Sequence, residues 1–269
     1  MEITKAVILA RGLGTRMRRA DDGVALEAGQ AEAAAAGVKA LIPVGRPFLD
    51  YVLSSLADAG YTDVCLVIGP EHDALRDRYA RELELARLRI HFAVQREPRG
   101  TADAVLAAES FAAGEELLVV NSDNLYPPAV LRSLRELPGA GLGVFSGRGL
   151  VRGGIAAERL RSFALVKVDG AGFLVDIVEK PDDATFASFG DDPPVSMNCW
   201  RLPVSIFTAC RDIAPSHRGE LELPDAVRLT IARGARFAAV RSDDGVLDLT
   251  SRADIAAVTA QLRDVAVRL

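Results

Sequence analysis

The chain has 269 residues and a mass of 28.6 kDa, long enough to bury a substantial core in one large domain. Its net charge of −5 and pI near 5.4 argue against a surface for nucleic acid or for an anionic membrane, although a local basic cluster can still bind phosphate. The cysteines Cys65, Cys199 and Cys210 are odd in number and lack metal-type spacing, which indicates reduced core thiols and no zinc site.

The chain carries no stretch typical of a targeting or membrane-spanning segment. Its N-terminal apolar run is about five residues long before Arg11, shorter than the roughly 7–15 apolar residues of a secretory signal. No charge-free apolar stretch reaches the roughly 20 residues needed to cross a bilayer. We therefore expect a cytoplasmic protein without membrane contacts.

The segment from Ala6 to Arg19 combines an apolar run, glycines and a cluster of arginines. The run up to Ala10 is typical of a strand buried on both faces of a parallel sheet. Gly12 and Gly14 let a phosphate approach main-chain N–H groups, and the arginines add positive charge. A dinucleotide fingerprint would need a third glycine at Met17, and a P-loop would need a Gly-Lys-Ser/Thr ending. We predict a polyphosphate cradle; a glycine turn of structural use only is the alternative.

Strands and helices alternate after this turn. Periodic apolar residues predict helices over 50–60 and 71–88, and short apolar runs predict strands over 64–68, 90–94 and 117–120. This alternation indicates an α/β fold with a Rossmann-like, doubly wound, mixed but mainly parallel sheet. Ligands of such sheets bind beyond the carboxyl ends of the strands, so the loop over 11–16, the loop after Val94 and the loop after Val120 should share one rim.

Two of these loops carry side chains suited to ligand binding. Gln95 offers a donor and an acceptor to a base edge, and Gly100 and Thr101 open the next helix with free N–H groups. Asp123 follows the strand at 117–120, where a carboxylate can hold Mg²⁺ together with substrate phosphates. An ordinary turn into a helix and an Asx turn are the alternatives.

Beyond Gly153 the chain becomes rich in β-hairpin signals. Strand-like runs over 163–168 and 173–179 meet at Asp169-Gly170, a typical hairpin turn. We expect this part to be a β-rich subdomain inserted into the α/β fold. Trp200, in a further strand, suits either the core or a stacking platform for a ligand.

A series of motifs in this order resembles the sugar-1-phosphate nucleotidylyltransferases, or NDP-sugar pyrophosphorylases, which have a GT-A-like nucleotidyltransferase fold. They are G-x-G-T-R-M from Gly12, K-A-L-I-P-V-G-R-P from Lys39, Q-x-x-P-x-G-T-A-x-A from Gln95, the aspartate in N-S-D, E-K-P from Glu179, the asparagine segment at Asn198, R-G-E ending at Glu220, and the acidic pair Asp248 and Asp254. The resemblance spans residues 3 to about 262. Arg11, Ser122 and Thr250 depart from the family pattern.

The resemblance implies a role for each matched residue. Residues on the nucleotide would be Ala10, Arg11, Gly12, Gly14, Thr15, Gln95, Gly100 and Thr101. Catalytic residues would be Arg16 and Lys39 on the β,γ-phosphates and Lys180 on the sugar phosphate, although Lys39 can also be a solvated lysine. Glu179, Asn198 and Glu220 would contact the sugar, and Asp123 and Asp248 would bind Mg²⁺.

The implied activity is that of an EC 2.7.7 transferase in nucleotide-sugar biosynthesis. A sugar 1-phosphate oxygen attacks the α-phosphorus of a nucleoside triphosphate, which gives an NDP-sugar and pyrophosphate. One alternative is an enzyme of the same fold with a non-sugar acceptor such as phosphocholine. The other is an inactive regulatory homologue that binds a nucleotide sugar. The sequence leaves open the base, the sugar, the pathway and whether the chain forms a homo-oligomer.

We expect residues 1–269 to form a single nucleotidyltransferase domain. Residues 1–150 would be its nucleotide-binding half. Residues 151–269 would be its sugar-phosphate-binding half, ending in a closing helix that starts near Asp254.

An alanine-rich segment over 24–37, with Gly37 as its C-terminal cap, predicts a helix between Arg16 and Lys39. Family members usually lack it. Isolated helices of this length are marginal in water. We therefore expect a lid that becomes ordered when nucleotide binds, with a permanently docked helix as the alternative.

Overall fold

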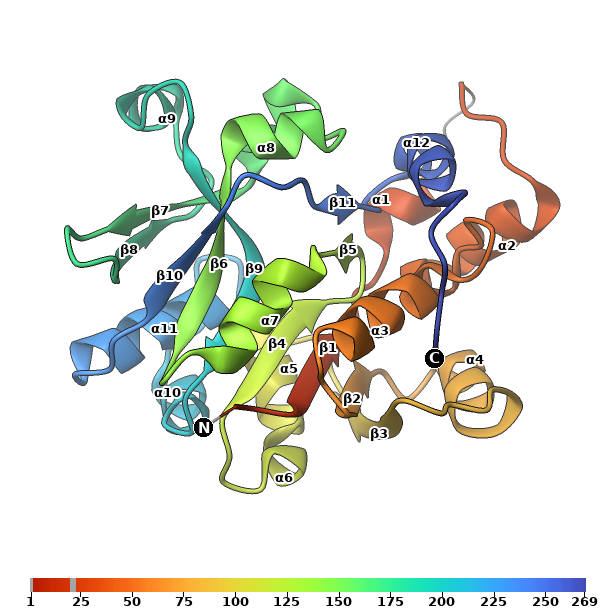
Figure 1. The fold of residues 1–269 in the computed structure, drawn as a ribbon, viewed down its shortest axis with the longest axis horizontal. Coiled ribbons are helices and arrows are strands. Elements are labelled where there is room, and N and C mark those ends of the chain that lie inside the picture. Colours follow the sequence, from red (N-terminus) through yellow and green to blue (C-terminus); the bar gives the residue numbers. More distant parts are fainter. Residues whose placement is uncertain (1, 20–22) are drawn as a thin grey trace.

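The computed structural model describes residues 2–19 and 23–269, which fold around one mixed sheet of nine strands (Figure 1). Seven strands lie in the order β10-β6-β9-β4-β1-β2-β3, and all of them except β9 run in the same direction. The hairpin of β7 and β8 attaches to β9 through β7. The mixed, mainly parallel sheet is therefore confirmed.

The strands of this sheet are β1 (Lys5–Leu9), β2 (Asp63–Ile68), β3 (Arg89–Val94), β4 (Leu117–Asn121), β6 (Gly141–Ser146), β7 (Ala164–Val168), β8 (Leu174–Val178), β9 (Pro194–Leu202) and β10 (Ala238–Ser242). β5 (Asn124–Leu125) and β11 (Leu247–Asp248) form a separate antiparallel pair. Strands from both halves of the chain interleave, because β6 lies between β9 and β10. Residues 1–150 and 151–269 thus share one sheet.

Helices cover both faces of the sheet (Figure 1). They are α1 (Thr15–Arg18), α2 (Ala28–Ala36), α3 (Phe48–Asp58), α4 (Asp73–Asp77), α5 (Thr101–Ala107), α6 (Glu109–Ala112), α7 (Pro128–Glu136), α8 (Gly147–Arg152), α9 (Asp183–Ser188), α10 (Ile206–Asp212), α11 (Leu223–Ala232) and α12 (Arg252–Leu262). Short 3₁₀ segments are η1 (Lys39–Leu41) and η3 (Ala157–Ser162). Within residues 2–19 and 23–269, no helix is both long and apolar enough to span a membrane.

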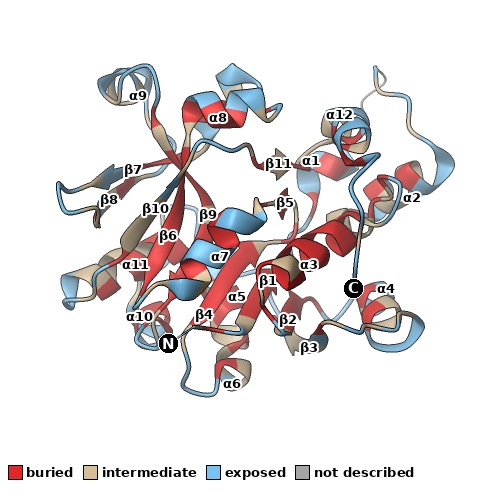
Figure 2. Cartoon of the chain, viewed as in Figure 1, coloured by how far each residue is buried: buried red, intermediate tan, exposed pale blue. Residues whose placement is uncertain are grey.

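The central strands are largely buried (Figure 2), and their side chains alternate between two cores. Ala6 and Ile8 of β1 pack into the core that contains α3 and α7, whereas Val7 packs into the core that contains α5, α10 and α11. Burial on both faces explains why these strands read as continuous apolar runs. Trp200 is fully buried in the second core and packs edge-on against Phe237, so it is a core residue and not a stacking platform. All three cysteines are buried free thiols.

The helix predicted over 71–88 is wrong in extent. α4 is one short helix that continues as a single π-helical segment, η2 (Arg78–Glu82), and the chain then runs to β3 without further helix. Asp50, buried on α3, explains the difference: Arg78 Nη2 donates to its Oδ2 at 2.6 Å, and the Tyr79 hydroxyl donates to its Oδ1 at 2.7 Å. These tertiary bonds override the helical propensity of this segment.

The inserted helix is present but starts later than predicted. α2 begins at Ala28 because Glu27 and Gln30 form a reciprocal capping box before it. Gly37 ends the helix with φ 74°, as its role as a cap predicts. Gln30 Nε2 donates to the Pro43 carbonyl at 3.0 Å, and Gln30 and Ala34 are the buried residues of the helix.

We expect α2 to exchange its amide hydrogens quickly in the free protein and at least about tenfold more slowly with nucleotide and Mg²⁺ present. The reason is its small buried area, which holds the helix weakly until ligand joins the segments on either side of it. Hydrogen exchange with mass spectrometry measures this. α3, buried over 48–57, serves as the internal control and should stay protected in both states. Equal protection of α2 with and without ligand would mean a permanently docked helix.

The pair of β5 and β11 brings the end of the chain to the strand ends. Asp248 lies opposite Asn124 in this pair. Directly after it, Ser251 and Asp254 form the capping box that starts α12, which confirms the closing helix. Arg252 Nε donates to the Met17 carbonyl at 2.9 Å, so α12 is also bonded to α1.

Candidate active site

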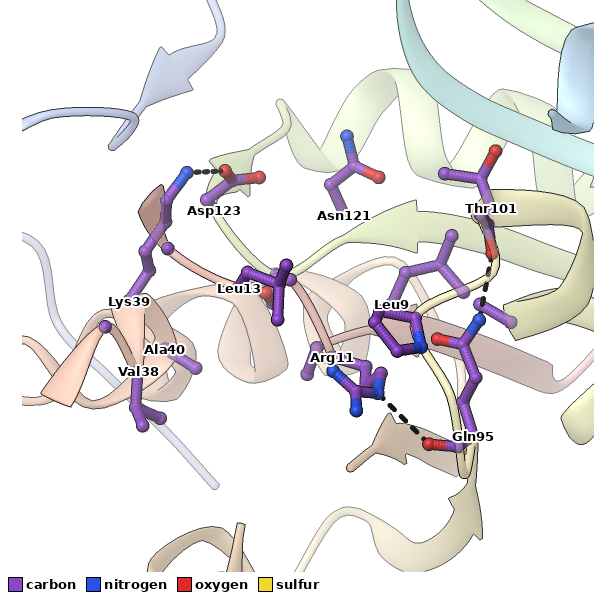
Figure 3. A pocket seen from close by; sticks show the side chains of 18 of the residues that line it. Leu9, Arg11, Leu13, Val38, Lys39, Ala40, Gln95, Thr101, Asn121 and Asp123 are labelled. Carbon is purple, nitrogen blue, oxygen red and sulfur yellow. Dashed lines mark hydrogen bonds and ion pairs between the residues drawn. The ribbon is translucent and has the colours of Figure 1, made fainter. Parts of the chain in front are cut away.

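The loops at the carboxyl ends of β1, β3 and β4 line one cavity of about 400 Å³, as the rule for such sheets predicts. This volume lies in the range of small-molecule sites. Figure 3 shows Lys39 and Asp123 at one end of the cavity and Gln95 and Thr101 at the other. Among its lining residues are Ala10, Arg11, Gly12, Gly14, Gly100 and Glu220.

Gly14 brings the first loop against the end of α2. Its φ is 61°, and a Cβ at this position would lie 2.2 Å from the Gly37 carbonyl oxygen. Any other residue would push the two segments apart. The glycine turn and the inserted helix therefore pack directly against each other. A hydrogen bond of 2.8 Å from Arg18 Nη2 to the Ala36 carbonyl also joins α1 to α2.

Gly100 permits an equally close contact on the other side of the cavity. Its φ is 112°, and a Cβ there would lie 2.4 Å from the Leu221 carbonyl oxygen. Leu221 N donates to the Arg99 carbonyl at 2.7 Å, and Ala102 N donates to the Leu221 carbonyl at 2.9 Å. This pairing explains why Glu220 lies at the cavity with the second loop.

The Gln95 side chain can present only an acceptor to a ligand. Its Nε2 donates to the Gly100 carbonyl at 3.0 Å and to Asp103 Oδ2 at 2.8 Å, so both amide protons are committed. Because both neighbours are acceptors, the orientation of the amide follows from the hydrogen-bond network. The remaining Oε1 suits a ligand that offers an N–H group.

Arg11 is a buried arginine that lines the cavity. It is 8% exposed, its Nε donates to the Gln95 carbonyl at 3.1 Å, and its Nη1 lies 3.3 Å from Glu71 Oε1 (Figure 3). The guanidinium therefore ties the first loop to the second.

The first and third loops meet in an ion pair. Lys39 Nζ donates to Asp123 Oδ2 at 2.7 Å (Figure 3). Both side chains are partly exposed to the cavity, at 18% and 23%. Lys39 thus lies within the cavity as a cation paired with Asp123.

A second, smaller pocket of about 150 Å³ adjoins the first, since Asn121 and Asp123 line both. It brings Asp248, Glu179 and Asn198 to the same Asp123. The two pockets therefore follow one another along the rim and meet at Asn121 and Asp123.

Asp248 is a buried carboxylate, 7% exposed. Asn124 Nδ2 donates to its Oδ1 at 3.0 Å, Thr250 Oγ1 donates to Oδ1 at 2.8 Å, and Arg159 Nη2 donates to Oδ2. Burial raises the pKa of Asp248, and the nearby negative charge of Asp123 raises it further.

Backbone strain marks two of the predicted sugar-phosphate residues. Lys180 has φ 43° and Asn198 has φ 57°, and Ala113 is the only other non-glycine residue with positive φ in the described part of the chain. Such conformations cost of order 1–3 kcal/mol and cluster at functional sites. The strain supports a functional role for both residues.

Lys180 lines a further pocket of about 370 Å³ together with Glu179, Arg218 and Glu222. Arg218 pairs with Glu222 through both ends of its guanidinium, at 3.2 and 2.8 Å. Burial of the Glu179 carboxyl raises its pKa, and Glu222 raises it further, although the residue as a whole is exposed. The cation of Lys180 therefore lies in a polar, mixed-charge surrounding.

Some predicted site residues lie elsewhere than expected. Thr15 and Arg16 are exposed on α1 and are not among the residues that line these pockets. Glu220 lines the first cavity with Gln95, whereas the sugar role would place it with Asn198 in the second pocket. Its location follows from the pairing of Leu221 with the second loop.

Residues that the sequence did not single out also contribute. Asp103 accepts a hydrogen bond from the Gln95 amide, and Asn124 donates one to Asp248. Both residues stand next to motifs recognised in the sequence, and this position could have identified them. Arg159 carried no such signal, because it lies 89 residues before its partner Asp248.

The donor set fits a hard cation such as Mg²⁺. The described residues contain no group of three or more His, Cys, Asp or Glu side chains placed to hold a metal. Asp123 and Asp248, flanked by Asn121, offer oxygen ligands only. Mg²⁺ typically binds through one or two carboxylates and completes its shell with water and substrate phosphates.

This sheet, with its ligand rim and β-rich addition, is an α/β nucleotidyltransferase fold. Among solved structures it is similar to a crystal structure of UDP-glucose pyrophosphorylase complexed with UDP-glucose, with a TM-score of 0.74, 19% identity, and coverage of 97% of this chain and 98% of that one. The sequence profile of the Nucleotidyl transferase family matches residues 34–264. The chain therefore belongs to this family.

The curated relatives are named as sugar-phosphate nucleotidyltransferases. A glucose-1-phosphate thymidylyltransferase of Actinoplanes sp. is 28% identical over 237 residues, 86% of this chain and 68% of that protein. A UTP–glucose-1-phosphate uridylyltransferase of Haloferax volcanii is 25% identical over 253 residues, 91% and 90% of the two chains. The chain spans 58% of the length of a third relative, a low-salt glycan biosynthesis nucleotidyltransferase of the same organism, at 25% identity and 86% coverage of this chain.

Proposed function

We propose that this protein transfers a nucleotidyl group from a nucleoside triphosphate to a sugar 1-phosphate, releasing pyrophosphate. The observation that carries this function is the pair of adjoining pockets that share Asp123. A nucleotide in the larger pocket and a sugar phosphate beside the smaller one would bring their phosphates together at this residue.

The protein's own groups do mainly electrostatic work in this reaction. The nucleophile is a phosphate oxygen that is already anionic, so no general base is needed. Catalysis requires in-line positioning of two anions that repel each other and neutralisation of the charge that develops. Lys39 and, after its side chain turns inward, Arg16 would bind the β,γ-phosphates. Lys180 would bind the acceptor phosphate, while Glu179 and Asn198 would contact sugar hydroxyls.

Asp123 and Asp248 would hold Mg²⁺. The cation supplies charge neutralisation at the α-phosphate. Lys39 pairs with Asp123 and Arg159 pairs with Asp248, so without a bound metal the protein's own cations balance the charge of the two carboxylates.

The base would be one that offers an imino N–H group. Gln95 Oε1 is the free group of the side chain, and it can accept from N3–H of uracil or thymine or from N1–H of guanine. Adenine and cytosine present an acceptor at the corresponding ring nitrogen, which would face Oε1 without a hydrogen bond. An unpaired buried acceptor costs about 1–3 kcal/mol.

A matrix of nucleoside triphosphates against hexose 1-phosphates tests the reaction and the base together. We expect pyrophosphate release, measured as phosphate after pyrophosphatase, with UTP, dTTP or GTP and at least about tenfold less with ATP and CTP. Pyrophosphate release with phosphocholine, but with none of the sugar phosphates, would identify a non-sugar acceptor. Nucleotide-sugar binding without release in any combination would identify a non-catalytic homologue.

A cytoplasmic location is part of the same proposal. Cys65, Cys199 and Cys210 are free thiols in the core, which suits a reducing compartment. Nucleoside triphosphates and sugar phosphates would be the partners.

A further inference from the structure

Arg159 binds two acidic residues, Asp248 and Asp254, in the segment that runs from β11 into α12. It lies in η3, and its Nη2 donates to Asp248 Oδ2 while its Nη1 donates to Asp254 Oδ1 at 2.9 Å. The side chain is 30% exposed. One guanidinium therefore connects the carboxylate that we propose as a metal ligand to the capping residue of α12.

The bond from Arg159 nearly completes the hydrogen bonding of Asp248. A carboxylate has about four lone-pair sites. Asn124 donates to Oδ1, Arg159 donates to Oδ2, and the Thr250 hydroxyl lies within hydrogen-bond distance of both oxygens, at 2.8 Å from Oδ1 and 3.0 Å from Oδ2. A cation that approached Asp248 would therefore have to share Oδ2 with a positively charged group.

Asp123 differs from Asp248 in this respect. Among the described residues its carboxylate is engaged at Oδ2 alone, by Lys39 at 2.7 Å, and its side chain is 23% exposed. Asp123 can thus offer its free Oδ1 to a cation, whereas both oxygens of Asp248 already accept hydrogen bonds.

We propose that Arg159 is the resident counter-ion of Asp248 and controls access of a divalent cation to Oδ2, an inference that rests on the proposed function. In the free protein the guanidinium holds Oδ2, which keeps two interacting carboxylates from facing each other without a counter-charge. When Oδ2 turns to a cation, Asp254 retains the guanidinium through Nη1. Arg159 is therefore a positioning residue that sets the affinity for the metal, and it returns to Asp248 when the metal leaves.

Arg159→Gln tests this role, and Arg161→Gln is its matched control. Both changes remove one positive charge from η3, but Arg161 is exposed and pairs at 2.6 Å with Asp183, which lies on α9. We expect Arg159→Gln to lower the Kd for Mn²⁺ about tenfold and Arg161→Gln to leave it unchanged. The measurement is an electron paramagnetic resonance titration of the whole chain with Mn²⁺, without nucleotide and at constant ionic strength. Adding Asp248→Asn to Arg159→Gln should abolish the gain.

The inference is overturned if Arg159→Gln and the unchanged protein bind Mn²⁺ with the same Kd, or if neither binds Mn²⁺ detectably. Weaker Mn²⁺ binding by Arg159→Gln would overturn it as well. If that variant does not fold, Arg159→Lys replaces it. Lysine keeps the charge but cannot bridge both aspartates, so a Kd about threefold lower is expected, and an unchanged Kd contradicts the role.

The same titration separates this inference from the proposed metal site. Loss of Mn²⁺ binding in Asp123→Asn and Asp248→Asn, with no effect of Arg159→Gln, would disprove only the role of Arg159. Unchanged binding in both aspartate variants would instead disprove the metal site itself.

Discussion

Asp123→Asn is expected to lower kcat by about 100- to 1000-fold while leaving the fold intact. Asparagine keeps the volume of the side chain and can still accept the hydrogen bond from Lys39, which is 2.7 Å away. It removes the negative charge at the point where the two pockets meet. A neutral ligand binds Mg²⁺ less tightly, so the charge that develops at the α-phosphate loses its main stabilisation.

Pyrophosphate release at saturating Mg²⁺ measures this loss, and thermal unfolding checks that the variant is folded. Asp183→Asn is the control, because Asp183 is an exposed carboxylate that pairs with Arg161 away from both pockets. A kcat close to that of the unchanged protein would show that Asp123 does not bind the metal.

Lys180→Ala is expected to reduce kcat/KM for the sugar 1-phosphate by about 10- to 100-fold, with little change in KM for the nucleotide. A hydrogen bond to a charged group contributes about 1.5–3 kcal/mol, which corresponds to that range. Lys180 lies apart from the nucleotide cavity, so its ammonium should meet the acceptor phosphate alone.

Initial rates with each substrate varied in turn distinguish the two effects. Lys167→Ala is the matched control, since Lys167 is an exposed lysine on β7 whose nearest carboxylate oxygen is 3.9 Å away. Lys180→Arg should restore part of the activity because it keeps the charge. A higher KM for the nucleotide with no change for the sugar phosphate would reverse the two subsites.

Some features of this protein were readable from local sequence. The strands at 64–68, 90–94 and 117–120 stand within one residue of their predicted bounds. Continuous apolar runs identify strands buried on both faces, whatever their partners. Gly37 was equally legible, because a helix cap depends on the backbone conformation that a single residue permits. The hairpin also lies at the Asp169-Gly170 signal, although its left-handed residue is Gly172, with φ 85°.

Other features depended on contacts between distant residues. The helix predicted over 71–88 changes to a π-helix at Arg78, where Asp50, on another helix, binds Arg78 and Tyr79, and it ends at Glu82. Glu220 reached the nucleotide cavity because Leu221 pairs with the loop at Gly100. Periodicity carries no information about such pairings, since each depends on how the sheet brings remote segments together.

By itself the sequence determined the α/β order, the glycine turns and the set of loops that form the rim, because these follow from residue period and backbone freedom within a few positions. Only the tertiary structure decided what each charged residue of the site faces. Arg11 binds a carbonyl 84 residues away, and Arg159 binds a carboxylate 89 residues away. A charged side chain acquires its partner only after folding closes such long loops, so the same arginine can be a solvated surface residue or the counter-ion of a buried carboxylate.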